Sequence, residues 1–144
     1  MNVGIDTDFL VRLAVREHAG HEAAERVRDE RLDAGDRFAV APQVMAEFVH
    51  VVSDARRFEA PLSPNDAVAW AKAWWTAAEV DPIPPSAAAM EQFFDWMVEH
   101  QLGRKRILDT LLAATYVTAG ITHLLTGNSA DYRIFDGLEL IELP

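Results

Sequence analysis

Four acidic residues lie at points of the sequence where a strand ends or a helix begins, and they could do chemistry together. These residues are Asp6, Glu47, Asp109 and Asp131. Two unit charges about 4 Å apart repel by roughly 1 kcal/mol in water and by about 4 kcal/mol at an effective dielectric near 20. Carboxylates that gather therefore need a cation among them or must keep a proton. A site made only of oxygen ligands suits Mg²⁺ or Mn²⁺, ions that activate water and neutralise charge in phosphoryl chemistry.

The elements that must position these acids alternate along the chain. Apolar runs predict five short strands, at 2–5, 38–41, 80–83, 122–126 and 138–143. Helical spacing and capping residues predict helices at 9–14, 21–32, 42–52, 63–75, 86–103 and 107–119. This alternation predicts one α/β domain over residues 1–144, a three-layer α/β/α arrangement around a central, mainly parallel sheet of about five strands.

The predicted topology brings the acids together. Asp6 follows the first strand, Glu47 lies in the first turns of the helix after the second strand, and Asp109 is near the start of the helix 107–119. Asp131, with Asn128 beside it, is expected in the loop after the fourth strand. Because ligands bind beyond the carboxyl ends of parallel strands, the four acids are expected on one rim.

The composition restricts the possible functions. The chain has 144 residues and no cysteine, which excludes disulfides, thiolate zinc sites and cysteine nucleophiles. The five histidines do not have metal-ligand spacing. No segment has the character of a secretory signal or the apolar length of a membrane span, so a cytoplasmic location is expected. The net charge of −10 counts against a general nucleic-acid binder, but less against an enzyme that makes a few local contacts.

Four segments carry a resemblance to a known family. Gly4-Ile5-Asp6-Thr7-Asp8-Phe9-Leu10 resembles the opening motif of PIN domains, and Met45-Ala46-Glu47-Phe48 resembles the second motif. The segments 107–115 and 124–132 are similar to the third and fourth motifs. The four follow one another in the family's order over essentially the whole chain. The length of the chain resembles that of the VapC toxins within this family.

The resemblance implies an activity and a set of site residues. It implies a ribonuclease in which metal-activated water hydrolyses an RNA phosphodiester, leaving a 5′-phosphate and a 3′-hydroxyl. Asp6, Glu47 and Asp109 would hold Mg²⁺ or Mn²⁺, and Asp131 would complete this quartet of catalytic and metal-binding acids. Residues expected to support these ligands or to order water are Thr7, Asp8, Thr126 and Asn128. The family more often has asparagine or serine where Asp8 stands, so Asp8 either adds a fifth acid or caps the first helix.

Two further features concern partners. The basic run Arg104-Lys105-Arg106 precedes the Asp109 helix and is either a solvated loop or a contact for RNA phosphates. Trp70, Trp74 and Trp75 lie on one predicted helix, as core or as an interface, and lead us to expect a homodimer. The resemblance to toxins implies a second partner, a small antitoxin protein.

Two rival functions remain open. Asp6-Thr7-Asp8 after an apolar strand is also similar to the Asp-x-Asp motif of haloacid-dehalogenase-like phosphatases. That family expects a lysine in a suitable context, and Lys72 and Lys105 are the only lysines. The other rival is a PIN-like module that binds a partner without catalysis.

Overall fold

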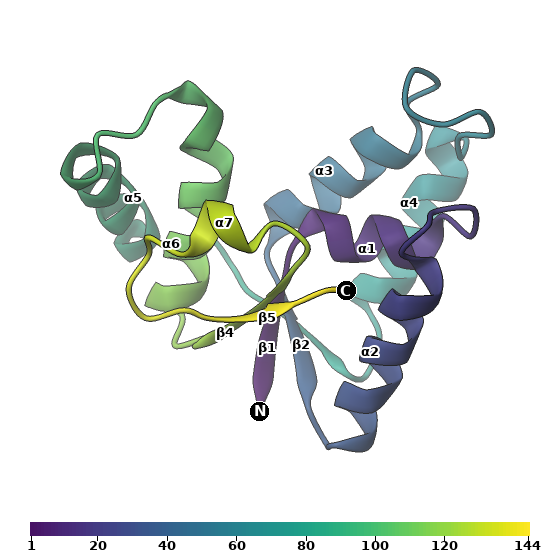
Figure 1. Cartoon of the computed structure of the whole chain (residues 1–144), viewed down its shortest axis with the longest axis horizontal. Coiled ribbons are helices and arrows are strands. Elements are labelled where there is room, and N and C mark those ends of the chain that lie inside the picture. Colours follow the sequence, from purple (N-terminus) through teal and green to yellow (C-terminus); the bar gives the residue numbers. More distant parts are fainter.

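A sheet of five parallel strands separates two layers of helices in the computed structural model, which describes residues 1–144 (Figure 1). The strands are β1 (Asn2–Ile5), β2 (Arg37–Val40), β3 (Val80–Pro82), β4 (His123–Thr126) and β5 (Glu139–Glu142). Their order across the sheet is β3-β2-β1-β4-β5, and every neighbouring pair is parallel. The predicted α/β/α class and the five short strands are confirmed, with bounds that differ by one or two residues.

The helices divide between the two faces of this sheet. One layer holds α1 (Thr7–Ala14), α2 (His21–Asp33), α3 (Pro42–Val52) and α4 (Pro64–Trp75). The other holds α5 (Ala87–Glu99), α6 (Ile107–Thr118) and α7 (Ser129–Tyr132), which lie on the left in Figure 1. The basic run Arg104–Arg106 forms a short 3₁₀ turn before α6. None of the helices combines the length and the apolar character needed to cross a membrane.

The order of the strands creates one special crevice. The chain moves from β1 to β2 and β3 in one direction, and from β4 to β5 in the other. The reversal falls between β1 and β4, where Ile5 pairs with Leu125. At such a reversal the connecting helices leave on opposite faces of the sheet, so a crevice opens beyond the carboxyl ends of the two strands. Asp6 and Thr126 stand at this crevice.

Aromatic side chains fill the layer between the sheet and α1–α4. Trp74 lies edge-on to Phe9, with ring centroids 6.3 Å apart, and also contacts Phe38. Trp70 stacks on Phe48 at 4.7 Å. All three tryptophans considered for an interface pack against the core. Trp75 also borders an open apolar groove between α3 and α4.

On the opposite face, α6 packs directly onto β1 at a glycine. The fully buried Tyr116 lies over Gly4, and its hydroxyl donates to the carbonyl of Ile5 at 2.5 Å. The same hydroxyl accepts a hydrogen bond from the backbone N–H of Ala41 at 3.3 Å. These contacts join α6, β1 and the segment after β2, and they fix the end of β1 at which the crevice opens.

We predict that Gly4→Ala destabilises the protein by about 1–3 kcal/mol, because a Cβ at this position would lie 2.9 Å from the Tyr116 ring, whose hydroxyl is held from both sides. Urea unfolding of the variant measures this loss. Gly103→Ala is the control, since nothing lies within 4 Å of its Cβ position. Equal stability of the two variants would contradict this account of how α6 seats on β1.

Candidate active site

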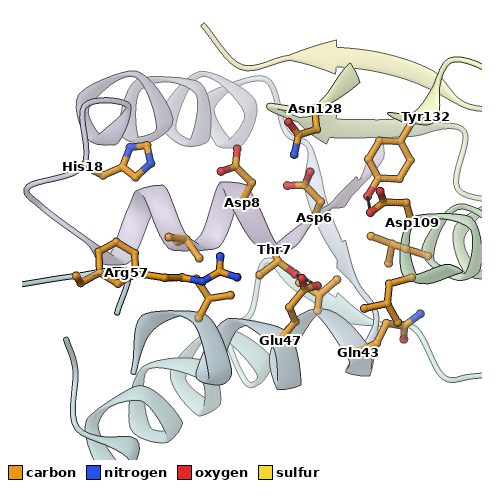
Figure 2. A pocket seen from close by; sticks show the side chains of 16 residues that line it. Asp6, Thr7, Asp8, His18, Gln43, Glu47, Arg57, Asp109, Asn128 and Tyr132 are labelled. Carbon is orange, nitrogen blue, oxygen red and sulfur yellow. Dashed lines mark hydrogen bonds between the residues drawn. The ribbon is translucent and has the colours of Figure 1, made fainter. Parts of the chain in front are cut away.

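A cleft with a volume of about 350 Å³ opens beyond the carboxyl ends of the strands. Figure 2 shows its side chains, which come from α1, α3, α6, α7 and the segments that follow β1, α1, α3 and β4. The predicted site residues that line it are Asp6, Thr7, Asp8, Glu47, Asp109 and Asn128. Three of the four predicted catalytic acids thus share one cavity, although they are far apart in the sequence.

Asp6 is the most deeply buried acid of the cleft. Its side chain caps α1 by accepting the backbone N–H of Phe9 at 3.0 Å. Its other oxygen accepts the hydroxyl of Thr126 at 2.5 Å. Burial nevertheless raises the pKa of Asp6 to about 7, and the neighbouring charges of Asp8 and Asp109 add to the rise. The same carboxylate therefore caps α1 and lines the cleft.

Glu47 reaches the cleft from the middle of α3. Its carboxylate accepts the hydroxyl of Thr7 at 2.8 Å, which ties α3 to the first residue of α1. This hydrogen bond agrees with the prediction that Thr7 supports a neighbouring acid. Helix α3 begins at Pro42, because proline is favoured in a first helical turn.

Asp109 lies in the first turn of α6 and receives a hydrogen bond that the sequence analysis missed. The hydroxyl of the buried Tyr132 donates to its Oδ1 at 3.1 Å. Burial raises the pKa of Asp109, and the charge of Asp131 contributes to the rise. Burial, followed by the charges of Asp6 and Asp109, also raises the pKa of Tyr132 well above its usual value. The tyrosine consequently remains a hydrogen-bond donor at neutral pH.

Asp8 is held by an arginine on its own helix. Its carboxylate lies 2.9 Å from Nε of Arg12, one helical turn further along α1. A Cβ on Gly127 would overlap the ends of both side chains, so a larger residue in the loop after β4 would require the ion pair to shift. The suggestion that Asp8 caps the first helix is wrong, because Asp6 occupies the capping position. Asp8 adds a fifth acid to this region, one whose charge is balanced by Arg12.

Asp131 and the basic run lie outside the cleft lining. Asp131 belongs to the short helix α7 rather than to a loop, and its carbonyl oxygen accepts a hydrogen bond from Arg106. Its carboxylate acts on the cleft through charge, as one cause of the raised pKa of Asp109. Arg104 and Lys105 are exposed on the 3₁₀ turn, whereas Arg106 is half-buried.

Thr126 and Asn128 complete the crevice from the β4 side. The hydroxyl of Thr126 donates to Asp6 and accepts the backbone N–H of Asn128 at 2.9 Å. The Asn128 side chain lines the cleft beside Asp6 (Figure 2). Neither of the two lysines lines the cleft, which removes the charge that the phosphatase alternative needs.

The chemistry of the donor set fits a divalent cation. Asp6, Glu47, Asp109 and Asn128 offer only oxygen atoms and an amide, as Mg²⁺ and Mn²⁺ prefer. Burial is the main cause of the raised pKa values of Asp6 and Asp109, and a bound cation would favour the charged form of both acids. No three acidic or histidine side chains are close enough together to hold one ion as they stand. Binding would therefore require side-chain rotation toward a common centre.

Comparison with known proteins agrees with the fold described above. Residues 3–135 match the PIN domain family. The fold is similar to that in a VapBC2 structure from Rickettsia felis bound to a promoter DNA fragment, with a TM-score of 0.72, 16% identity and full coverage of both chains. It is also similar to VapC20 of Mycobacterium tuberculosis, described as a toxin that cleaves the sarcin–ricin loop, with a TM-score of 0.66, 21% identity and coverage of 90% of this chain and 94% of that one. VapBC-1 of Haemophilus influenzae gives a TM-score of 0.67 at 16% identity, with 99% and 98% covered. No curated protein matches the sequence.

We predict that the metal-free protein loses stability as the pH rises from about 4 to about 7. The folded state holds the Asp6 proton more tightly than the unfolded state, because the pKa of Asp6 is raised on folding. The free energy of unfolding therefore falls by up to about 1.4 kcal/mol per pH unit across this window and stays lowered above it.

Urea unfolding in chelator, at several pH values, measures the effect. Asp6→Asn is the informative variant, since its amide oxygen can still cap α1 while the titrating proton is gone. Its unfolding free energy should fall less steeply than that of the wild type. Parallel curves for the two proteins would show that Asp6 does not carry the pH dependence.

Proposed function

The chain belongs to the PIN-domain family, and we propose from its cleft that it is a metal-dependent endoribonuclease that acts as the toxin of a type II toxin–antitoxin pair. The observation that carries the nuclease proposal is the meeting of Asp6, Glu47 and Asp109 in one cavity at the sheet reversal. The similarity to structures of VapBC complexes and of a loop-cleaving toxin supports the toxin role.

Asp6, Glu47 and Asp109 are the residues that would hold Mg²⁺ or Mn²⁺. The chemistry supplied by a bound ion of this kind is activation of water and neutralisation of charge on the phosphoryl group. We assign Asp131 a supporting charge near Asp109, and we retain it as a fourth catalytic acid. The reaction is hydrolysis of an RNA phosphodiester to a 5′-phosphate and a 3′-hydroxyl.

The other polar groups of the cleft orient these acids. Thr126 directs one oxygen of Asp6, Thr7 directs Glu47, and Tyr132 directs Asp109. Tyr132 keeps its proton, so it holds Asp109 as a donor and does not compete as a base. Each of the three acids thus has a neutral hydroxyl partner, which adds no charge to the site. Asn128 lies at the open side of the cleft, where its amide can order water.

We predict that the purified protein cuts RNA with Mg²⁺ or Mn²⁺ and that Asp109→Asn lowers the rate at least about 100-fold, in the range seen when a catalytic group is removed. The measurement is the cleavage of a generic RNA on a denaturing gel. Asp95→Asn, an exposed acid on α5, is the control for loss of one negative charge and should leave the rate unchanged. Undiminished cutting in excess chelator would contradict the metal mechanism.

We also propose two protein partners and a cytoplasmic location. The first partner is a small antitoxin that blocks the cleft. The second is another copy of this chain. Met90, Phe94 and Val98 stand one turn apart on α5 and are exposed by 39%, 57% and 79%. This apolar stripe, at helical spacing on one face, supports a symmetric dimer through α5.

We predict that Phe94→Asp converts the dimer into a monomer, because a buried charge would face its own copy across the symmetry axis. Light scattering at high micromolar concentration measures the mass. Val68→Asp on α4 is the matched control, since Val68 is 53% exposed but borders the groove between α3 and α4. If the wild type is a monomer, the dimer proposal is wrong. If Val68→Asp is a monomer while Phe94→Asp remains a dimer, the interface lies at the groove between α3 and α4 and not on α5.

A further inference from the structure

One side of the cleft holds two hydrogen-bond donor side chains that are separate from its central acids. Arg57 and His18 line the cleft on the side away from Asp109 and Tyr132, with their polar groups apart from one another (Figure 2). Arg57 is the only arginine or lysine in the cleft lining. It comes from the segment after α3, and His18 comes from the turn between α1 and α2. The catalytic assignments above use neither residue.

The hydrogen bonding of His18 determines what it offers to the cleft. Its Nδ1 accepts the backbone N–H of Gly20 at 2.9 Å. A ring nitrogen that accepts a hydrogen bond carries no proton, so the proton of the neutral ring is on Nε2. His18 is half-buried and lines the cleft. The residue therefore presents an N–H donor, without needing a positive charge.

The guanidinium of Arg57 offers further hydrogen-bond donors to the cleft. Its Nε lies 3.6 Å from Asp54, beyond ordinary hydrogen-bond distance, and its side chain is 58% exposed. Asp54 in turn accepts the backbone N–H of Arg56 at 2.9 Å. The guanidinium of Arg57 points along the cleft toward Thr7 and Glu47 (Figure 2). Its terminal nitrogens can therefore meet a ligand that occupies the cleft.

We propose that Arg57 and His18 each contact the RNA backbone at phosphates next to the one that is cut. A ligand for two donor groups, one of them a fixed cation, must be an acceptor with negative charge, and phosphate oxygens meet this requirement. An RNA strand whose reacting phosphate lies at Asp6 and Asp109 carries its neighbouring phosphates along the cleft. Phe58 and Val51 line the wall near Arg57 and provide apolar surface for the attached nucleoside. This inference rests on the proposed ribonuclease function.

The sequence offers a matched pair of variants for the test. Arg57→Gln removes the cation in the cleft. Arg56→Gln removes the same charge one residue earlier, from a side chain that is 90% exposed and outside the cleft lining. For the histidine, His18→Asn keeps an acceptor for Gly20 and loses the Nε2 donor, whereas His18→Gln keeps an amide donor near the Nε2 position.

The experiment measures binding of a fluorescein-labelled single-stranded RNA by polarisation, at several salt concentrations. It uses the Asp109→Asn protein with Mg²⁺, so that the RNA stays intact. Arg57→Gln should weaken binding and flatten the dependence of log K on log salt by about 0.7, the contribution of one phosphate contact on a single strand. Arg56→Gln should leave the slope unchanged. His18→Asn should weaken binding more than His18→Gln does.

The outcomes separate this inference from the function it rests on. If the wild type cuts RNA but Arg57→Gln and Arg56→Gln give the same slope, the phosphate contact is wrong and the ribonuclease stands. If Arg57→Gln leaves RNA binding intact but weakens binding of a labelled polyglutamate peptide, Arg57 contacts an acidic protein segment and the inference also fails. If the wild type neither binds nor cuts RNA with Mg²⁺ or Mn²⁺, both the proposed function and this inference are wrong.

Discussion

The burial of the Asp6 carboxylate between the ends of β1 and β4 is the constraint on which the site depends. An isolated buried carboxylate is costly, and this one is only 4% exposed. Two donors, the Phe9 N–H and the Thr126 hydroxyl, offset part of that cost. The same two contacts start α1 and hold the end of β4 in place. Folding thus builds the crevice around an acid that is poorly compensated without a cation.

The arrangement is also compatible with the proposed RNA substrate, although the chain is acidic. The net charge is −10, but the acids of the cleft lie at the sheet reversal, where a divalent ion can be held. Asp8 is paired with Arg12, and the end of the cleft near Arg57 carries hydrogen-bond donors. Local placement of charge, rather than the total, therefore decides whether a phosphate backbone can enter.

Much of the fold and the centre of the site follow from sequence patterns. Alternating apolar runs and helices predict a parallel sheet, and acids directly after strands are brought to one edge by that topology. Asp6, Glu47 and Asp109 could be found in this way. Tyr132 could not, because it looks like an ordinary core aromatic until α7 places its hydroxyl on Asp109. His18 and Arg57 come from connecting segments, whose paths depend on packing that no local pattern encodes.

The central claim is that these acids form one metal site. Calorimetric titration of the metal-free protein with Mn²⁺ near neutral pH tests it most directly, with buffers of different ionisation enthalpy to count released protons. The account predicts saturable binding with proton release, since Asp6 has a pKa of about 7 and must lose its proton to bind the ion. The release should disappear in Asp6→Asn, and Asp109→Asn should weaken the affinity. Unchanged binding in both variants, or no binding to the wild type, would contradict the account.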